Sequence, residues 1–205
     1  MLVFLDSDGR SYNALAHTLP SARGQGEPLS GRFKAKNDAR FVGVIMGSGD
    51  SKVLLASNAG YGFVGTLNDM VTKNKAGKAC LSVPSGGTAL PPVMIEPGLH
   101  DADSASVAAV TNQGRLLVFA LKDLPELAKG KGNKLLNLPL AAFKSGEEEL
   151  VGAVVVGEKN ELLVHAGQRH LRLKARDLES YAGERARRGR RLPRGFQKVD
   201  RLSIE

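Results

Sequence analysis

The 205-residue sequence contains a single cysteine, Cys80, and no tryptophan. One cysteine excludes an internal disulfide, which fits a reducing cytoplasm. The longest apolar runs, such as residues 151–156, are far shorter than the roughly 20 residues of a membrane-spanning helix. The apolar start of the chain is followed at once by Asp6 and lacks the basic head of a signal peptide. We therefore expect a cytoplasmic protein.

The sequence is also poor in the patterns that mark catalytic, nucleotide and metal sites. It has no GxxxxGK[ST] loop, and residues 60–65 match the GxGxxG fingerprint without a helical pattern after them. Because that first glycine belongs to a repeat described below, a turn is the favoured interpretation. No zinc-type spacing joins Cys80 to the dispersed histidines, of which only the last two are near in sequence: His17, His100, His165 and His170. We expect no catalytic residue, no metal and no cofactor in this chain.

What the sequence does contain is a fourfold repeat. Each unit has an apolar triplet, a glycine turn, a second apolar run, a Leu or Met and a basic glycine-rich loop. The turn glycines are 51, 54 and 53 residues apart: Gly9, Gly60, Gly114 and Gly167. The basic loops occupy residues 22–28, 73–79, 128–134 and 183–191. A period of this length predicts an array of blades, each of which buries its apolar face against its neighbours.

Each unit is expected to form four strands, which makes the fold all-β. The strands predicted in the second unit are 52–57, 62–67, 79–83 and 93–96, and those in the third are 107–111, 116–121, 135–138 and 150–156. Residues 121–127 and 175–181 each predict one helical turn. The loops 84–90, 98–106 and 144–149 are expected at the surface, with the acidic run 147–149 in solvent. The blades are expected at about 2–51, 52–106, 107–161 and 162–205, within a single domain.

The formal charge of +8 is unevenly distributed. Residues 184–201 hold eight basic side chains against two acidic ones. Lys and Arg gain affinity for phosphates by releasing condensed counterions, so a basic tail beside repeated basic loops predicts a track for a polyanion. A disordered tail that only keeps the protein soluble is the alternative for this segment. That alternative does not explain why the charged loops recur in register with the blades.

Several long strings resemble one protein family. They are LDSDGRSY from Leu5, TLPSARGQGEPL from Thr18, LLASNAGYGFVGTLNDMVTKNKAGKA from Leu54, VFALKDLPELAKGKGNKLLNLP from Val118 and GERARRGRRLPRGFQKVDRLSI from Gly183. Together they are similar to the C-terminal domain of the A subunit of bacterial DNA topoisomerase IV. The related domain of the gyrase A subunit has a box of glutamine, paired arginines and paired glycines. This chain lacks that box, which favours topoisomerase IV.

The resemblance implies a β-pinwheel, a propeller-like and open array in which neighbouring blades exchange a strand. It implies a basic outer rim that binds and bends duplex DNA and presents the segment to be transported in decatenation and supercoil relaxation. Relatives have a further blade before this point, so we expect a fragment without its first blade. ATP, Mg²⁺, the cleaving tyrosine and the B subunit would belong to other parts of the enzyme. Packing roles are expected for Tyr12, Tyr61 and Tyr181.

The residues expected to bind DNA lie in or near the four basic loops and in the tail. They are Arg23, Arg32, Lys73, Lys75, Lys78, Lys129, Lys131, Lys134, Arg185, Arg187, Arg188, Arg190, Arg191 and Arg194. Besides DNA, the resemblance implies a chromosome-condensing complex as a partner, because some relatives have a partner of this type. It also implies that the protein is associated with the nucleoid. Three alternatives remain open, namely a DNA-wrapping domain of the gyrase type, a propeller-like scaffold that binds protein, and an enzyme with a central pocket.

Overall fold

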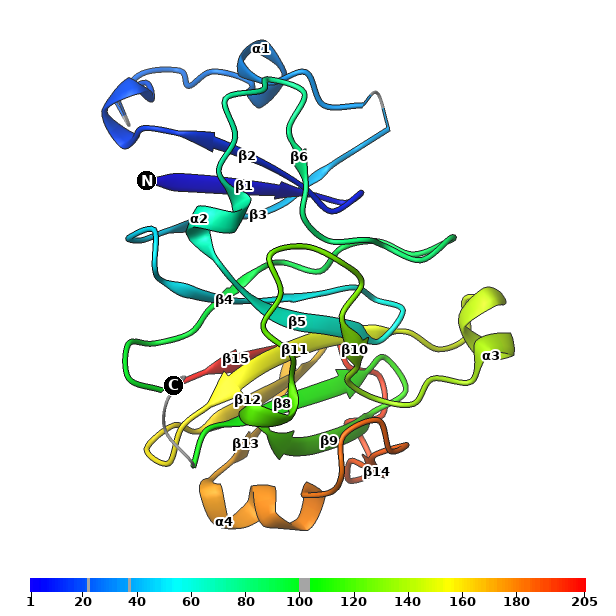
Figure 1. The fold of residues 1–205 in the computed structure, drawn as a ribbon. Helices are drawn as coiled ribbons and strands as arrows, with labels where there is room; N and C mark the ends of the chain where they lie inside the picture. Colours follow the sequence, from blue (N-terminus) through cyan, green and yellow to red (C-terminus); the bar gives the residue numbers. More distant parts are fainter. Residues whose placement is uncertain (22, 37, 100–103) are drawn as a thin grey trace.

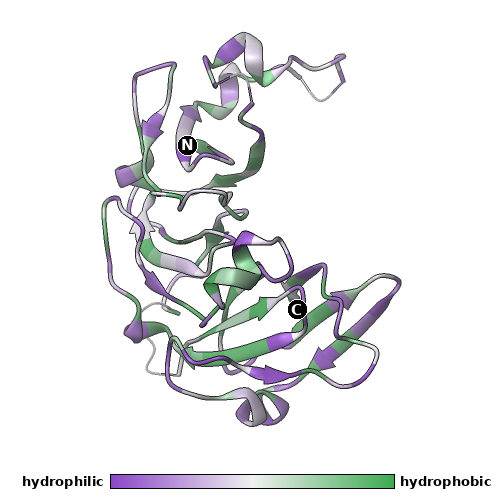
Figure 2. Ribbon diagram, turned by 90° about the vertical axis from the view of Figure 1, so that its right-hand side faces the viewer, coloured by the Kyte–Doolittle hydropathy of each residue, from purple (hydrophilic) through white to green (hydrophobic). Residues whose placement is uncertain are grey.

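The computed structural model describes residues 1–21, 23–36, 38–99 and 104–205. Ala22, His100 and residues 101–103 of the 98–106 loop lie outside this part of the chain. Four antiparallel sheets follow one another from the N-terminal to the C-terminal end (Figure 1). Seen from the side, the molecule is curved, with the first and last sheets at its two ends (Figure 2). This arrangement of successive sheets is propeller-like.

The strands group into sheets in a repeated order. The first sheet, in the order β3-β1-β2-β6, contains β1 (Leu2–Asp6), β2 (Arg10–Ala14), β3 (Phe41–Met46) and β6 (Lys78–Ala79). The second, β10-β5-β4-β7, contains β4 (Lys52–Ala56), β5 (Tyr61–Thr66), β7 (Val93–Met94) and β10 (Asn133–Lys134). The third, β11-β8-β9-β14, contains β8 (Ser106–Thr111), β9 (Arg115–Ala120), β11 (Leu150–Val156) and β14 (Arg190–Arg191). The fourth, β13-β12-β15, contains β12 (Leu162–Ala166), β13 (Arg169–Leu173) and β15 (Arg201–Ile204).

Helices in the described residues are single turns between strands. They are η1 (Ala16–Thr18), α1 (Leu29–Arg32), α2 (Leu67–Met70), η2 (Leu121–Asp123), α3 (Leu140–Lys144), α4 (Ala175–Leu178) and η3 (Glu179–Tyr181). The helical turns predicted at 121–127 and 175–181 are confirmed by η2 and by α4 with η3. A capping box in which Thr66 and Asp69 bond each other's backbone begins α2.

Each of the first three sheets is completed by a strand from the following repeat. The strand β6 pairs with β2, β10 pairs with β5, and β14 pairs with β9, through two residues in each case. This exchange places the basic loop of one repeat beside the hairpin of the repeat before it. Figure 1 shows β6, β10 and β14 in succession down one side of the molecule. In the sequence, only the family resemblance pointed to this exchange.

Three details of the predicted strands are wrong. Residues 135–138 are not a strand, because pairing stops at Lys134 and the buried Leu135, Leu136 and Leu138 fill the core as irregular chain. Likewise the strand predicted at 79–83 ends at Ala79. The fourth sheet has three strands in the described residues, not four, since β13 has no partner on its outer side.

The core consists of apolar layers between successive sheets. Alternate residues of β4 point to opposite sides: Val53 and Leu55 pack toward the first sheet, and Leu54 and Ala56 toward the third. Strands β8 and β9 similarly contribute to the layers on both of their sides. This is why the triplets of the repeat are apolar at every position. Figure 2 shows the resulting concentration of apolar residues on the strands and polar residues on the loops.

Glycines fix the point at which each exchanged strand begins. Gly77, Gly132 and Gly189 directly precede β6, β10 and β14, and each has φ near +75°. A Cβ at Gly132 would lie 2.1 Å from the carbonyl oxygen of Gly62, and one at Gly77 would lie 2.7 Å from the ring of Tyr12. Only glycine combines this backbone conformation with so close an approach.

We expect Gly132→Ala to lower the free energy of unfolding by about 3 kcal/mol or more, since left-handed strain and a backbone clash add. Gly146→Ala is a matched control, because Gly146 has φ +73° and no atom within 4 Å of its added Cβ. That control should cost only the roughly 1–2 kcal/mol of the left-handed conformation. Denaturant unfolding of both variants measures the difference, and equal losses would show that the close approach to Gly62 is unimportant.

Candidate nucleic-acid interface

In each of the first three repeats, the chain just after the basic loop is hydrogen-bonded through its backbone to the basic loop of the next repeat. The amide of Lys34 donates to the carbonyl of Lys75 at 2.8 Å, which joins the first loop region to the second. The amide of Ser82 donates to Gly130 O at 2.8 Å, which joins the second to the third. The amide of Asn137 donates to Arg187 O at 2.9 Å, which joins the third to the fourth. The loops therefore form a continuous series, which we call the loop row.

The residue that follows each turn glycine holds the next basic loop in the first three repeats. Arg10 donates through Nε to Ala76 O at 2.9 Å and through Nη2 to Gly77 O at 2.7 Å. Arg115 donates through Nη1 to Gly189 O at 3.4 Å. In the second repeat this position is Tyr61, and the Lys131 ammonium lies 4.4 Å from its ring centroid, within cation–π distance. These docking residues were not predicted from the sequence, although the Gly-Arg pair in two of the repeats marks them.

The N-terminal part of the loop row surrounds an open groove of about 520 Å³. Arg32, Lys73 and Lys75 line this groove together, and Arg23 lies exposed on the loop before α1. The Arg32 guanidinium is 2.9 Å from Glu27 Oε2 and also donates to Thr18, so an acidic neighbour balances its charge. The exposed cations here are therefore Arg23, Lys73 and Lys75, and the half-buried Lys78 lies within β6.

The C-terminal part of the loop row has the higher density of guanidinium groups. Arg185 donates to Lys134 O at 2.7 Å, so these two cations from successive repeats lie beside each other. Arg191 is paired in register with Arg115 on β9. Exposed side chains on this section are Lys129, Lys131, Lys134, Arg187, Arg190, Arg191 and Arg194. Among them, Arg187 forms an exposed ion pair with Glu184 at 2.6 Å, and Arg190 donates to Ser180 O at 2.8 Å.

Arg188 and Glu148 form a buried ion pair that the sequence did not predict. The Arg188 guanidinium donates to both carboxylate oxygens of Glu148, at 2.8 and 2.5 Å, and Thr111 donates to the same carboxylate at 3.0 Å. The exposed fraction of Glu148 is only 3%. The expectation that residues 147–149 are all solvated is therefore wrong for Glu148, because a guanidinium 40 residues away in sequence offsets the cost of burying its charge.

This cluster has more positive than negative charge. Burial by itself raises the pKa of Glu148. Hydrogen bonds from Arg188 and Thr111 and the charges of Arg188 and Arg115 outweigh that effect, so the pKa is lowered. Burial, followed by the neighbouring charges of Arg188 and Arg191, lowers the pKa of Arg115. The guanidiniums of Arg188 and Arg115 thus act on one carboxylate, and Arg191 adds a third positive charge beside Arg115. Such an arrangement is suited to an additional anionic group, for which arginine is a preferred partner.

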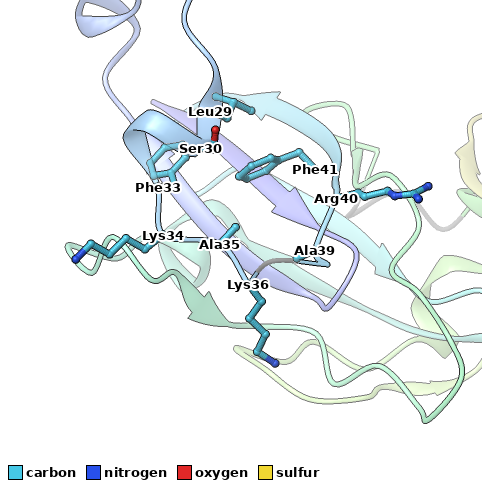
Figure 3. A pocket seen from close by; sticks show the side chains of 9 residues that line it. All are labelled: Leu29, Ser30, Phe33, Lys34, Ala35, Lys36, Ala39, Arg40 and Phe41. Carbon is cyan, nitrogen blue, oxygen red and sulfur yellow. The ribbon is translucent and has the colours of Figure 1, made fainter.

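A hollow on the first blade carries three cations that were not selected from the sequence. In Figure 3, Phe33 and Phe41 face its apolar centre, and Lys34, Lys36 and Arg40 extend away from it. The two rings pack with centroids 6.1 Å apart in a cluster with other aromatic side chains of this blade. The hollow has a volume of about 730 Å³, and Lys34 is the residue that joins the first loop region to the second. The two phenylalanines that flank three basic residues in this segment are the signal that could have identified it.

Tyr12, Tyr181 and His165 each have packing or hydrogen-bond partners in the fold. Tyr12 is 1% exposed and donates to Asp6 Oδ2 at 2.8 Å, and burial followed by Asp6 raises its pKa to about 12. Tyr181 packs against the apolar layer between the third and fourth sheets. His165 Nε2 lies 2.8 Å from Ser203 Oγ on the last sheet. Within the described residues, no three His, Cys, Asp or Glu side chains gather as they would around a metal ion.

Comparisons with known proteins agree on one family. A family model described as "DNA gyrase C-terminal domain, beta-propeller" matches residues 105–157. The A subunit of DNA topoisomerase 4 from Pseudomonas aeruginosa is 50% identical over 203 residues, which are 99% of this chain. The structure of the Escherichia coli ParC C-terminal domain superposes with a TM-score of 0.86 at 46% identity, and the match covers 100% of this chain and 80% of that one. This chain belongs to the family of C-terminal domains of the topoisomerase IV A subunit.

The matched relatives are much longer than this chain. It spans 26% of the P. aeruginosa A subunit, and also 26% of the protein from E. coli K12, to which it is 47% identical. The resemblance inferred from sequence, including the preference for topoisomerase IV over gyrase, is confirmed. The mainly β, propeller-like fold is confirmed as well. Among the described helices of this topoisomerase IV domain, none has the length and apolar composition needed to span a membrane.

Proposed function

We propose that this domain binds duplex DNA along the loop row without reading its sequence. The observation that carries the proposal is the backbone hydrogen bonding of each later basic loop to the chain that follows the loop before it, which supports a series of basic loops along the curved array. Lysine and arginine side chains on such loops contact phosphates, which position a duplex but carry no base information. The positive field around Arg115 and Arg191 supports DNA contact at the C-terminal end of the row.

The curvature of the array gives the proposed contact a mechanical consequence. A straight duplex touches one or two loops of a curved rim, and only a bent duplex reaches all of them. Bending 20–30 bp through 40–90° costs on the order of 1–6 kcal/mol, which contacts from several blades can offset. The domain is therefore proposed to bend DNA and to prefer bent or crossed segments.

In the whole enzyme, the domain would present the segment that is transported during decatenation and supercoil relaxation. DNA cleavage would belong to the catalytic core, together with its Mg²⁺, and ATP would act through the B subunit. Partner proteins in this proposal are a chromosome-condensing complex and the B subunit, which is reached through the core. The setting is the cytoplasmic nucleoid. The division of this chain into blades at about 2–51, 52–106, 107–161 and 162–205 is part of the same proposal.

A gyrase-type DNA-wrapping domain is the nearest alternative, and a propeller-like scaffold for protein is the other. Wrapping needs contact over a longer duplex. It would change the linking number of closed circular DNA after relaxation, whereas bending alone would not. A scaffold would leave duplex DNA unshifted at moderate salt. Neither a scaffold nor an enzyme with a central pocket accounts for basic loops that recur in register.

The proposal predicts a strong dependence on duplex length and on salt. Binding to a long duplex should fall by several decades between 50 and 200 mM salt if roughly six to ten phosphates are contacted. A duplex that spans only one blade should bind poorly, because it cannot reach several loops. Gel-shift titrations with duplexes of about 20 bp and about 200 bp, in unrelated sequences, measure both effects, because bending is costly at the shorter length. Equal affinity per site for both lengths would contradict contact along the whole row.

A further inference from the structure

A small apolar pocket lies beside the loop row, between the second hairpin and α3. Its floor is formed by Leu136 and Leu138, which are 1% and 9% exposed. Tyr61 and Phe143 also line it, and Leu140, at 65% exposure, leaves a large apolar surface open to solvent at the rim. Figure 1 shows α3 projecting from the body of the array at this point. An exposed leucine beside an apolar cavity indicates a surface suited to an apolar group from outside.

Three ammonium groups surround this apolar centre. Lys131, Lys134 and Lys144 line the pocket, and Lys131 is positioned over the Tyr61 ring. None of the side chains that line the pocket, all of them in the described part of the chain, is acidic. An apolar centre within a cationic rim is complementary to an apolar side chain flanked by carboxylates.

The size of the pocket restricts the occupant further. Its volume of about 220 Å³ is below the roughly 300–1,000 Å³ of pockets that enclose a drug-sized ligand. It suits a single large side chain of the kind that anchors protein interfaces. A DNA phosphodiester has no apolar group to fill such a space, so the phosphate contacts proposed for Lys131 and Lys134 leave the pocket itself unexplained.

We infer that this pocket is a docking site for an acidic segment of a partner protein that inserts one large apolar side chain. The site goes beyond the proposed DNA function and shares two cations, Lys131 and Lys134, with the loop row. A segment bound here therefore places carboxylates where phosphates would lie. Partner and DNA compete for this section of the row, and the partner reduces the number of blades that a duplex can contact.

The test uses the whole domain and a fluorescein-labelled peptide of sequence Glu-Asp-Glu-Leu-Phe-Asp-Glu, measured by fluorescence anisotropy. A second peptide with two serines in place of Leu-Phe has the same charge. We expect the first peptide to bind about ten-fold more tightly than the second, as an anchor side chain requires. A long duplex should displace it. Equal binding of the two peptides would overturn the proposal, because charge alone would then explain the attraction.

Two protein variants locate the site. Leu140→Ser should weaken binding of the Leu-Phe peptide about five-fold or more, consistent with loss of an interface contact. Met46→Ser is the matched control, because Met46 is also 65% exposed but lies on the first sheet. The proposal is refuted if Leu140→Ser leaves peptide affinity unchanged, or if it weakens duplex binding as much as peptide binding, since the pocket would then belong to the DNA surface. Peptide binding that depends on Leu140 in a domain that fails to bind duplex would support the pocket and contradict the proposed DNA function.

Discussion

Replacement of Lys129, Lys131 and Lys134 by alanine is expected to reduce the slope of log affinity against log salt by about 2.7, at about 0.9 per phosphate contact. These side chains are exposed on the third loop of the row, in the middle of the array. If the electrostatic contribution vanishes near 1 M salt, the same loss corresponds to about two to three decades of affinity at 0.1 M salt. In the intact enzyme, the change should impair strand transport more than DNA cleavage, because the proposed role of this domain is presentation.

A control variant with the same change in net charge separates the loop row from general electrostatics. Lys122, Lys159 and Lys174 lie at the ends of the third and fourth sheets away from the glycine turns, as the pairing of β8 with β9 and of β12 with β13 shows. Alanine at these three positions should change the salt slope by much less. Salt titrations of both triple variants on one long duplex provide the comparison. Equal slopes for the two variants would show that the basic loops are not the DNA track.

Removal of Arg188 from its ion pair with Glu148 is expected to destabilise the fold, because it leaves a buried carboxylate without its main partner. Arg188→Gln leaves the Glu148 carboxylate buried with Thr111 and the more distant Arg115. Breaking a buried pair costs about 3–5 kcal/mol, and we expect the lower end because the Arg188 side chain is 34% exposed. The exposed pair of Arg187 and Glu184 is the control, and Arg187→Gln should change stability by less than about 1 kcal/mol. Comparable losses in the two variants, measured by urea unfolding, would contradict a special role for the buried pair.

The same pair gives the stability a defined pH dependence. Because the pKa of Glu148 is lowered in the folded state, the carboxylate contributes stability above its unfolded pKa of about 4.3, and this contribution is lost as pH falls through the folded value. As the pH falls below the unfolded pKa, the wild type should therefore lose stability more steeply than Glu148→Gln. A pH series of urea midpoints at constant salt measures the difference. Parallel curves for the two proteins would show that Glu148 does not titrate with folding.

The sequence predicted the features that repeat locally. The turn glycines Gly9, Gly60, Gly114 and Gly167 all have positive φ, as the hairpin turns required. The strand at residues 150–156 was predicted with its observed bounds. These predictions succeeded because a glycine turn and an apolar run are determined by neighbouring residues, and because four copies of the pattern reinforce one another.

The errors concern contacts between repeats. A strand of two residues is too short to show an alternation of apolar and polar residues in the sequence. The apolar residues 135–138 therefore resembled a strand more than residues 133–134 did, although it is residues 133–134 that pair. Glu148 was assigned to solvent because its partner, Arg188, comes from the next repeat. In the candidate site, charge and loop position selected cations that are exposed together with some that are not, such as Arg188, and they missed the exposed Lys34 and Arg40. They did not predict the docking role of Arg10 and Arg115, because a guanidinium that binds carbonyls and one that is free for a phosphate look the same in sequence.

The exchanged strands also set an order for assembly on the ribosome. The first sheet is incomplete until β6 has been synthesised, the second waits for β10, and the third waits for β14. Each hairpin thus emerges with an open edge that only the next repeat closes. A nascent chain arrested between repeats exposes that edge to other strands, so the array is most vulnerable to aggregation while its last repeat is still inside the exit tunnel.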